Sequence, residues 1–213
     1  MNDRSEQIEF WRGDFGNDYI ERNLPTKEMM RSRINLWSSI LSKLIGRPPA
    51  SVLEVGANVG NNLRAISTLS SAELWALEPN DKAREKLVEN NIVKPDNAFG
   101  GTGADLSLPD GSVDLVFTSG VLIHIHPDDL LDNCKQMHRV AKRYVVCIEY
   151  FSDKPEELMY REHTNKLFKR DFGGFWMDNF PDLQLIDYGF VWKRVTGLDN
   201  LTWWIFEKRS DIV

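Results

Sequence analysis

The sequence predicts an α/β fold in which a mostly parallel sheet of about seven strands carries helices on both faces and ends in an antiparallel strand. Between residues 51 and 151, short continuous apolar runs alternate with helix-like stretches. Such runs are typical of parallel strands that are buried on both faces. Two further β-rich runs close the chain, and a helical segment precedes the first strand. These three observations favour one domain with an N-terminal extension.

Residues 1–50 are predicted to form a helical lid over the sheet. The first 25 residues are polar with interspersed aromatic side chains. Thr26 is a suitable N-cap for the helix that follows, and Gly46 and Pro48 end that helix. The apolar residues of this helix recur at helical spacing, at Met30, Ile34, Trp37, Leu41 and Leu44.

Residues 51–213 are predicted to form the main domain. Pro127 and the acidic residues after it suit the first turn of a helix. The strands of the first half are expected at 51–56, 73–79, 97–104, 113–121 and 143–151, the third being weak. The helices between them are expected at 61–70, 81–90 and 127–141.

The end of the chain has a different pattern. A polar, helix-compatible segment begins after residue 152 and extends to about residue 170, and residues 169–182 are typical of an ordered loop. We interpret about 153–180 as an insertion. The β-rich runs 183–195 and 201–209 are joined by a short turn that suits a hairpin, so the last strand is expected to be antiparallel.

Bulk properties limit the class of partner. The chain has 213 residues, of which 42% are hydrophobic and 27% charged, and its net charge of −6 disfavours long nucleic acid as a partner. The N-terminus is too polar for a signal peptide and no apolar run is long enough to span a membrane, so we expect a cytoplasmic protein. Cys134 and Cys147 have neither disulfide nor CxxC spacing, and the histidines lack partners at ligand spacing, so no metal site is expected.

The turn after the first strand is the most informative motif. Glu54 ends that strand, and Gly56 and Gly60 follow it within the sequence LEVGANVGNN. A dinucleotide-binding turn would carry glycines where Asn58 and Asn61 stand, and a phosphate-binding loop would need a Gly-Lys-Ser/Thr sequence. A glycine turn before a helix N-terminus still lets a ligand approach the backbone closely.

Carboxylates at the strand ends indicate the kind of ligand. Glu78 ends the second strand and Asp105 follows the third, so with Glu54 three acids meet at one edge of the sheet. S-adenosylmethionine carries a sulfonium, an ammonium and ribose hydroxyls but no pyrophosphate, so acids favour it over a dinucleotide. Glu78 is expected to accept from the ribose hydroxyls, and Asp105 from the adenine amino group. The alternative is that the glycines form structural turns only.

These motifs resemble those of the class I S-adenosylmethionine-dependent methyltransferases, which have a Rossmann-like fold. The resemblance covers residues 51–208, and within the class the chain is similar to the pseudaminic acid biosynthesis-associated methylases. It implies an activity close to the pathways of sialic-acid-like sugars. The matching stretches are FWRGDFGNDYIERN, LEVGANVGNNL, ALEPN, GTGADLSLPDGSVDLVFTSGVLIHIHPDDL, YRE-H with LFKRDFGG, and DYGFVWKR towards LTWWIFEK.

The resemblance also implies a role for each motif residue. Glu54, Gly56 and Gly60 would surround the methionine half of the cofactor, with the Asn58 amide beside its amino-acid end. Asn58 stands where many members have glycine, so the loop is expected to be less open. The other cofactor contacts would be Glu78 and Pro79 at the ribose, Asp105 and Leu106 at the adenine, and Ser119, Gly120 and Val121 at the methyl side.

Two histidines follow the fourth strand, His124 and His126, and strand alternation would point both to the same side. A hydroxyl or ammonium acceptor must lose a proton during methyl transfer. His124 is a candidate for that base and for substrate contact, with an ordinary structural role as the alternative. For His126 we favour the N-cap of the helix that begins at Pro127.

Residues 160–170 hold the second group of candidates, on what we interpret as the substrate side of the domain. Tyr160 and His163 can accept a proton. The basic residues suit an anionic acceptor, and a solvated helix face is the alternative. These basic residues are Arg161, Lys166, Lys169 and Arg170.

The N-terminal lid is expected to contribute Tyr19, Arg22 and Asn23 to the cofactor site. Arg22 would pair with the methionine carboxylate, which otherwise lacks a cation, and the alternative is a surface arginine on a packed helix. Three late tryptophans are expected to pack in the core or on the sheet, at Trp192, Trp203 and Trp204.

The sequence therefore predicts an S-adenosylmethionine-dependent methyltransferase that methylates oxygen or nitrogen of a small, anionic, sugar-related or other metabolite. A methyltransferase of peptides or natural products is one alternative. A non-catalytic cofactor-binding accessory protein is another. Each is compatible with a homo-oligomer or a complex with a pathway partner.

Overall fold

The computed structural model describes residues 3–209, and the side chains of residues 8–209. Its seven-stranded sheet has the order β3-β2-β1-β4-β5-β9-β8. The strands are parallel from β3 to β5, whereas β9 is antiparallel to both of its neighbours. The predicted fold class, with its antiparallel last strand, is confirmed. The strands are β1 (Ser51–Val55), β2 (Glu73–Leu77), β3 (Ala98–Phe99), β4 (Val113–Ser119), β5 (Ala141–Glu149), β8 (Leu183–Val191) and β9 (Leu201–Lys208).

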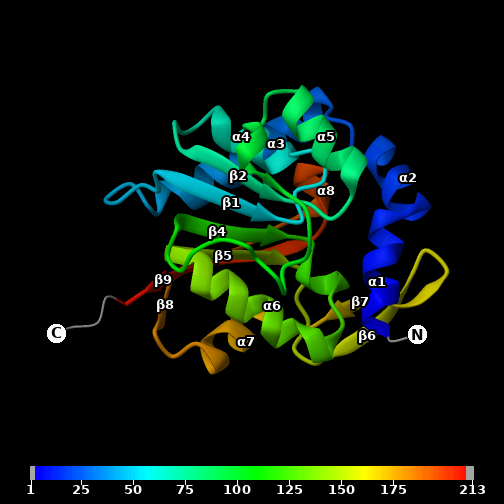
Figure 1. Cartoon of the computed structure of the whole chain (residues 1–213). Coiled ribbons are helices and arrows are strands. Elements are labelled where there is room, and N and C mark those ends of the chain that lie inside the picture. The colour runs from blue at the N-terminus through cyan, green and yellow to red at the C-terminus, as the bar shows by residue number, and fades with distance from the viewer. Residues whose placement is uncertain (1–2, 210–213) are drawn as a thin grey trace.

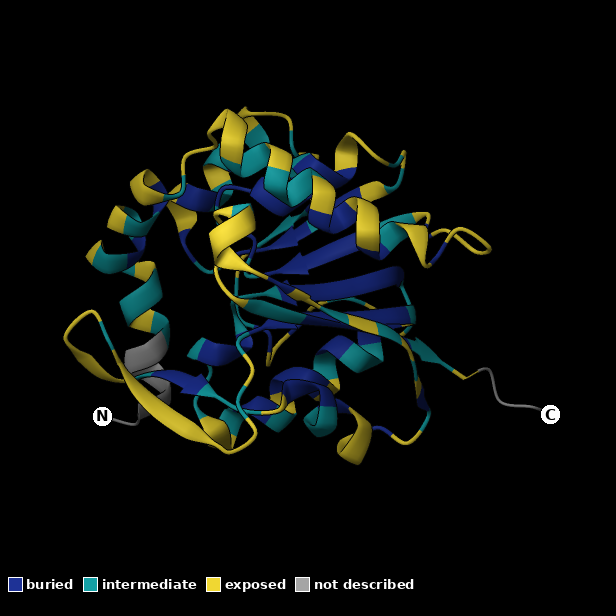
Figure 2. Ribbon diagram, turned by 180° about the vertical axis from the view of Figure 1, so that it is seen from behind, coloured by how far each residue is buried: buried dark blue, intermediate teal, exposed yellow. Residues whose placement is uncertain are grey.

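Helices cover both faces of this sheet (Figure 1). One face carries α3 (Lys27–Ser42), α4 (Asn61–Ser67) and α5 (Asp81–Glu89). The other carries α6 (Pro127–Val140) and α7 (Phe172–Asn179). Each face has its own cluster of buried apolar side chains. The central strands β1, β4 and β5 are almost wholly buried (Figure 2), whereas the edge strand β8 is partly exposed. Burial on both faces explains the continuous apolar runs of the strands.

Local sequence explains where the longer helices begin. Thr26 accepts a hydrogen bond from the backbone N–H of Met29 at 3.2 Å and caps α3. His126 accepts from the N–H of Asp128 at 3.3 Å and caps α6, with Pro127 at the first helical position. The N-cap role expected for His126 is therefore present. Trp37 of α3 is fully buried against Phe117 of β4, with ring centroids 4.5 Å apart.

The helix expected between residues 152 and 170 is wrong, because this segment forms a two-stranded antiparallel hairpin of β6 (Glu156–Tyr160) and β7 (His163–Lys169). Arg161 and Glu162 make its turn with positive φ angles of 49° and 71°. The segment is polar because most of the hairpin is exposed, and only Leu167 and Phe168 are buried. Polarity without periodicity does not distinguish a helix from a hairpin.

Three other elements differ from the expected ones. The ordered loop at 169–182 contains the helix α7, which Asp171 caps by accepting from the N–H of Gly174 at 2.9 Å. The strand expected at 183–195 ends at Val191, since Lys193–Thr196 form the short helix α8. The third strand is only two residues long, and 3₁₀ turns occupy Pro95–Asn97 (η1) and Leu122–His124 (η2).

The N-terminal helices α1 (Asp3–Arg12) and α2 (Asp14–Arg22) lie beside the hairpin at one edge of the molecule (Figure 1). The side-chain amide of Asn80 donates to the carbonyls of Trp11 and Arg12 at 3.1 and 3.3 Å and to Asn17 Oδ1 at 3.2 Å. The Asn61 amide donates to the carbonyl of Asn23 at 2.7 Å. Two asparagines of the main domain therefore hold the N-terminal segment by its backbone.

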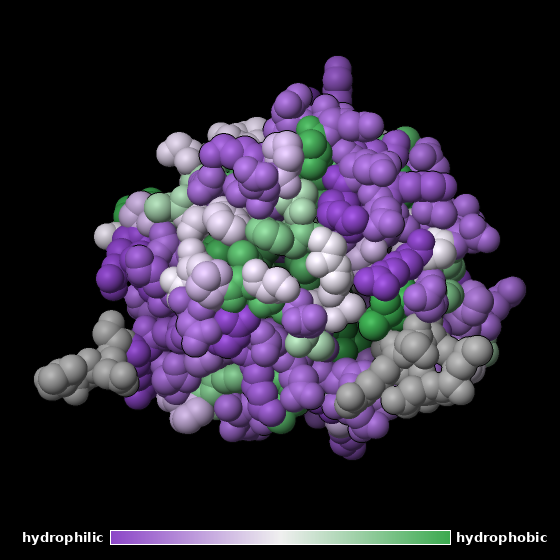
Figure 3. All heavy atoms as spheres, in the orientation of Figure 1, coloured by the Kyte–Doolittle hydropathy of each residue, from purple (hydrophilic) through white to green (hydrophobic). Residues whose placement is uncertain are grey.

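The molecular surface is mostly hydrophilic on the face of Figure 3, with apolar side chains gathered near its centre. Among the helices of residues 3–209, none has the length and apolar content needed to cross a membrane.

Candidate functional site

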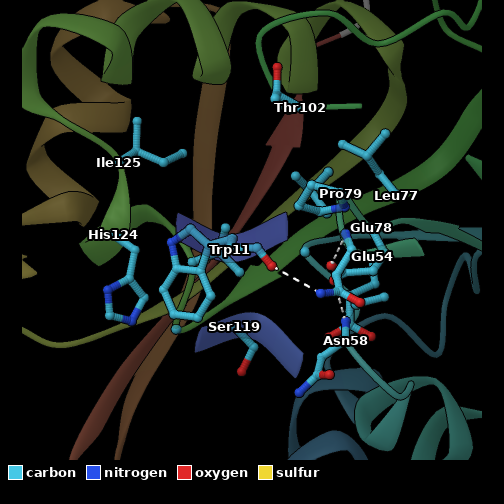
Figure 4. A pocket seen from close by; sticks show the side chains of 18 of the residues that line it. Trp11, Glu54, Asn58, Leu77, Glu78, Pro79, Thr102, Ser119, His124 and Ile125 are labelled. Carbon is cyan, nitrogen blue, oxygen red and sulfur yellow. Dashed lines mark hydrogen bonds between the residues drawn. The ribbon is translucent and has the colours of Figure 1, made fainter. Parts of the chain in front are cut away.

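A cavity of about 320 Å³ opens at the carboxyl ends of β1, β2 and β4. This is the edge at which open parallel sheets bind ligands, and the volume lies in the range of small-molecule sites. Residues from the N-terminal helices, including Trp11 and Tyr19, form its opposite wall. In Figure 4, Trp11 and His124 lie together on one side, and Glu54, Asn58 and Glu78 lie on the other.

The turn after β1 brings backbone to the cavity. Gly56 has a φ of 77°, and a Cβ there would lie 2.6 Å from Val121 Cγ2, so only glycine fits. Asn58, with a φ of 48°, lines the cavity as expected. Gly60 does not line it; a Cβ there would lie 2.6 Å from Leu87 of α5, so this glycine serves the packing of the helix start.

Glu54 is a buried acid with an unused acceptor. Its Oε1 accepts from Asn62 Nδ2 at 2.6 Å, whereas no residue that the structure describes hydrogen-bonds its buried Oε2. Burial raises the pKa of Glu54 to about 8, although the hydrogen bond from Asn62 opposes this. A cationic ligand group at Oε2 would satisfy the orphaned atom and favour the ionised form.

Arg33 lies beside Glu54 and was missed by the sequence analysis. It lines the cavity, and its Nη1 donates to Asn62 Oδ1 at 2.7 Å while its buried Nε has no partner among the described residues. Burial lowers the pKa of Arg33, and Glu54 counteracts this. The sequence did contain one indication that Arg33 is buried: it stands four residues before Trp37 and so lies on the same, buried face of α3.

Arg22, which was expected in the cofactor site, lies elsewhere. Its guanidinium is exposed and sits over the rings of Phe15 and Tyr19, 5.1 and 5.6 Å from their centroids, and it does not line the cavity. Tyr19 itself and Asn23 do line it. The N-terminal segment therefore supplies an aromatic wall, and the cation comes from α3.

An α-amino acid group would find complementary partners at this end of the cavity. Its ammonium can donate to Glu54 Oε2 and to Asn61 Oδ1, which is buried and also lacks a partner among the described residues. Its carboxylate can accept from Arg33. These orphaned polar atoms fit the methionine end of S-adenosylmethionine, since buried polar groups are normally hydrogen-bonded.

Glu78 stands at the end of β2 as expected and is buried. Its Oε1 accepts from the N–H of Asn80 at 2.8 Å and its Oε2 from the N–H of Asn58 at 2.6 Å. Burial raises the pKa of Glu78 to about 7 against these hydrogen bonds. Each carboxylate oxygen keeps a second lone pair, so Glu78 can still accept from a pair of vicinal hydroxyls. Pro79 lies beside it in the cavity wall.

The loop after β3 does not place Asp105 in the cavity. Asp105 is exposed, and Leu106 is buried in the core between the sheet and α6. The cavity wall is formed instead by Gly101–Ala104 together with Asn133. Gly103 packs closely there, because a Cβ would lie 2.6 Å from Asn133 Oδ1. This part of the cavity wall therefore comes from the glycine turn upstream of Asp105.

The end of β4 closes the cavity towards His124. Ser119, Gly120 and Val121 all line it, as expected. His124 Nδ1 lies 2.6 Å from the carbonyl oxygen of Lys166 in β7. A carbonyl only accepts, so Nδ1 carries the hydrogen and Nε2 of the neutral ring carries the lone pair. Burial lowers the pKa of His124 to about 4, against the effect of that hydrogen bond.

An aromatic cluster joins the hairpin to the N-terminal helices. Tyr160 lies 4.8 Å from His124, and His163 lies 4.9 Å from Phe10, between ring centroids. Neither Tyr160 nor His163 lines the cavity, and His163 is exposed. The structure therefore brings His124 and Tyr160 together and leaves His163 at the outer edge.

Of the expected basic residues, Arg161 and Lys166 lie over rings of this cluster, whereas Lys169 and Arg170 lie over other rings. Arg161 lies over Tyr160, Lys166 over Phe10 and Lys169 over Tyr150, at 5.9, 5.3 and 5.3 Å from the ring centroids. Arg170 lies over Phe175 at 5.1 Å. In the described part of the chain, these four and Arg22 form no ion pair with a carboxylate.

The late tryptophans and the two cysteines have no part in the cavity wall. Trp203 and Trp204 are buried in the two core clusters, one on each face of the sheet, whereas Trp192 is half exposed. Cys134 and Cys147 are buried and free. No group of three or more potential metal ligands occurs among the residues that the structure describes.

Comparison with known proteins agrees with this geometry. Residues 53–148 match the family model described as a methyltransferase domain. No curated protein matches the chain significantly. Among solved structures, the chain is similar to the 1,6-didemethyltoxoflavin N1-methyltransferase of Burkholderia thailandensis, with 19% identity, a TM-score of 0.71, and coverage of 97% of this chain and 90% of the other.

Two further solved structures share the fold. One is an S-adenosylmethionine-dependent methyltransferase of Leishmania major, with 18% identity, a TM-score of 0.70 and coverage of 95% and 82% of the two chains. The other is the magnesium protoporphyrin IX methyltransferase of Synechocystis with bound S-adenosylmethionine, with 14% identity, a TM-score of 0.65 and coverage of 99% and 98%. At 19% identity or less, these solved structures show a fold that this chain shares, and the family-model match over residues 53–148 supports the enzyme class.

Proposed function

We propose that this protein is an S-adenosylmethionine-dependent methyltransferase whose acceptor is a small anionic metabolite of the sugar-acid kind. One observation carries the enzyme class: Glu54 and Glu78, at the ends of neighbouring strands, share a single cavity with His124. The methyltransferase-domain match over residues 53–148 supports it independently.

The cofactor would lie along the strand ends. Glu54, Asn61 and Arg33 would hold the amino-acid end, whose charges they complement. Glu78 would accept from the ribose hydroxyls, and the turn at Gly101–Ala104 would cover the adenine. Bound in this way, S-adenosylmethionine supplies an electrophilic methyl group. Ser119, Gly120 and Val121 would border that group.

His124 is placed to take the acceptor proton. Its Nδ1–H is held by the Lys166 carbonyl, so the ring orientation is fixed and Nε2 is the basic nitrogen. No described residue hydrogen-bonds Nε2. The low pKa keeps this nitrogen unprotonated at neutral pH. Tyr160, beside His124, would orient the acceptor, and the remaining rate enhancement comes from alignment.

The acceptor charge is inferred from the cations around the aromatic cluster. In a chain of net charge −6, three cations lie over rings of the cluster and lack carboxylate partners among the described residues, namely Arg22, Arg161 and Lys166. Lys169 and Arg170, close to them in the chain, lack such partners as well. A carboxylate or phosphate on the acceptor would pair with them, and the aromatic faces would cover an apolar sugar face. The resemblance to the pseudaminic acid-associated methylases favours the same acceptor class.

The N-terminal helices would serve as the lid of this site, and the hairpin β6–β7 as its substrate-side insertion. Trp11 and Tyr19 line the cavity, and Phe10 contacts His163 of the hairpin. Closure of both parts over the acceptor would exclude water from the transfer position.

Binding and turnover test the proposal separately. Titration calorimetry with S-adenosylhomocysteine should give a dissociation constant in the micromolar range, weakened at least about 10-fold by Glu78→Ala. The matched control is Glu85→Ala on α5, an exposed acid outside the cavity. Transfer of labelled methyl groups to a panel of sugar acids and nucleotide sugars then tests the reaction. Binding without transfer to any acceptor would favour the accessory role.

A further inference from the structure

Glu149, the last residue of β5, is a buried carboxylate that no motif of the sequence singled out. It has no solvent-exposed surface. Its Oε1 accepts from the backbone N–H groups of Val121 and Leu122, both at 3.1 Å, and its Oε2 lies 3.4 Å from the N–H of Ile123. One side chain therefore binds three consecutive donors of the loop that leads to His124.

The negative charge of the Glu149 carboxylate is stabilised by backbone N–H groups and not by a cation. Among the described residues, no lysine or arginine forms an ion pair with it. Burial raises its pKa to about 7, and the N–H groups of the loop oppose this. A buried carboxylate without a cation is costly, but an apolar residue in its place would leave the N–H groups of Val121, Leu122 and Ile123 without this acceptor.

The loop that Glu149 binds is the one that carries the proposed base. Val121, the first donor, lines the cavity and packs against Gly56, which fixes the turn after β1 on one side. His124 follows the third donor directly, and its N–H donates to the carbonyl of Val121 at 2.9 Å. The backbone of His124 is thus held from β5 and its ring from β7, through Lys166.

We propose that Glu149 is a positioning residue for methyl transfer: it holds the loop Val121–Ile123 so that His124 and the wall at Val121 face the reacting atoms. The inference rests on the proposed function, since it assigns His124 the role of base. Glu149 does not line the cavity, so it acts through the loop backbone and not by contact with either ligand.

The test compares Glu149→Gln with Asp114→Asn. Gln keeps the volume but turns an NH₂ group towards backbone donors. Asp114 is the control because it is also buried, also accepts a backbone N–H (from Ala50, at 2.8 Å), and lies at the opposite end of β4; unlike Glu149, it also faces Lys142 and Arg143 at 4.0 and 3.8 Å. The readouts are the thermal midpoint, S-adenosylhomocysteine affinity, kcat, and the tautomer and pKa of His124 by NMR of the chain's four histidines.

Glu149→Gln should lower kcat on the order of 10- to 100-fold and leave cofactor affinity within about 3-fold, since the loop supplies one wall only. The pKa of His124 should rise from about 4 towards the ordinary value of about 6.5, and its tautomer should become mixed. Asp114→Asn should lower the thermal midpoint without moving His124. Glu149→Asp keeps the charge but is shorter, so it should give an intermediate His124 pKa.

Unchanged His124 pKa and tautomer in a folded Glu149→Gln protein would overturn the inference. If the Glu149→Gln protein does not fold, an unchanged His124 pKa and tautomer in Glu149→Asp would overturn the inference. These NMR readouts need no turnover, so the two proposals fail separately. A changed His124 pKa or tautomer in a protein that methylates nothing would contradict the proposed function, but it would still show that Glu149 holds His124 in place.

Discussion

The Nδ1 atom of His124 lies 2.6 Å from the carbonyl oxygen of Lys166, so the hairpin β6–β7 fixes the tautomer of a histidine that lines the cavity. The hairpin itself was not expected from the sequence. Its position against η2 gives the polar segment after β5 a role in the site. Because this hydrogen bond leaves Nε2 of His124 as the basic nitrogen, the first prediction concerns the protonation of that atom.

With S-adenosylmethionine saturating, the pH profile of kcat/KM for the acceptor should have its acid limb near pH 4. His124 must be neutral to accept a proton, and its pKa is lowered to about 4 by burial, so activity should be lost only as the pH falls through that value. Circular dichroism at each pH serves as the control for folding. An acid limb near the ordinary histidine value of about 6.5 would rule out the buried state of His124 during turnover.

Cofactor binding at pH 7 should release close to one proton. Burial raises the pKa of Glu54 to about 8, so the carboxyl is mostly protonated before binding. An ammonium beside Oε2 would favour its ionised form. Calorimetry with S-adenosylhomocysteine in buffers of different ionisation enthalpy measures this release. Glu54→Gln should remove most of it and leave a smaller release from Glu78, whose pKa is raised to about 7; an undiminished release in the variant would assign the proton to another group.

Arg33 and Arg22 should differ sharply in their effect on the cofactor. Arg33→Ala should weaken S-adenosylhomocysteine binding about 10- to 100-fold, because a charge-assisted hydrogen bond in a buried site contributes about 1.5–3 kcal/mol. Arg22→Ala should change it less than about 3-fold, since Arg22 is exposed outside the cavity. Equal effects of the two substitutions would contradict the assignment of the methionine carboxylate to α3.

The basic residues of the hairpin should affect the acceptor and not the cofactor. The double variant Arg161→Ala/Lys169→Ala should raise the KM of an anionic acceptor about 10-fold, given the modest energy of partly solvated ion pairs. Its cofactor affinity should be unchanged. Arg47→Ala/Lys82→Ala is the matched control, because both residues are exposed and lie outside the cavity. An unchanged KM in the hairpin variant would remove the anion from the proposal.

The ligand-free protein should lose stability as the pH rises from about 5 to 8. Burial raises the pKa values of Glu54, Glu78 and Glu149 to about 8, 7 and 7, so the folded state binds protons that the unfolded chain releases above about pH 4.5. Their contribution is full below that pH and is lost as the pH rises through the raised values. His124, with its lowered pKa, acts in the opposite direction between about 4 and 6.5.

Thermal unfolding at each pH measures this slope. Glu149→Gln should flatten it, because one of the three titrating carboxyls is removed. A midpoint that rises steadily from pH 5 to 8 would mean that these carboxyls are ionised in the folded protein.

The parts of the fold that the sequence predicts correctly are those with a strong local period. The apolar strands and the helices with clear caps, such as α6 with His126 and Pro127, follow from short-range rules. The hairpin β6–β7 does not, because its order comes from contact with η2 and the N-terminal aromatic residues. Its own sequence is polar and lacks alternation, so tertiary contacts determine its structure.

In the candidate site, too, the sequence predicts the residues whose position follows from local rules and misses those placed by tertiary contacts. Glu54, Gly56 and Glu78 lie at strand ends, where chain position alone determines the location of the side chain. Asp105 was misplaced because the loop after β3 turns at its glycines, and no spacing rule gives the path of such a loop. Arg33 was overlooked although it lies on the buried face of α3. Glu149 was hidden within an apolar strand, and only its contacts with the loop reveal it.

Asn80 has a consequence for the docking of the N-terminal helices. Its Oδ1 accepts from the N–H of Ala83 and caps α5, while its amide nitrogen holds the backbone at Trp11 and Arg12. The backbone N–H of Asn80 also donates to Glu78 Oε1, so the same residue contacts both the N-terminal segment and the cavity. With α1 and α2 docked in this way, Trp11 and Tyr19 form the wall of the cavity on the side of the N-terminal helices. We therefore expect the hydrogen bonds of Asn80 to couple the docking of the N-terminal helices to occupancy of the cavity.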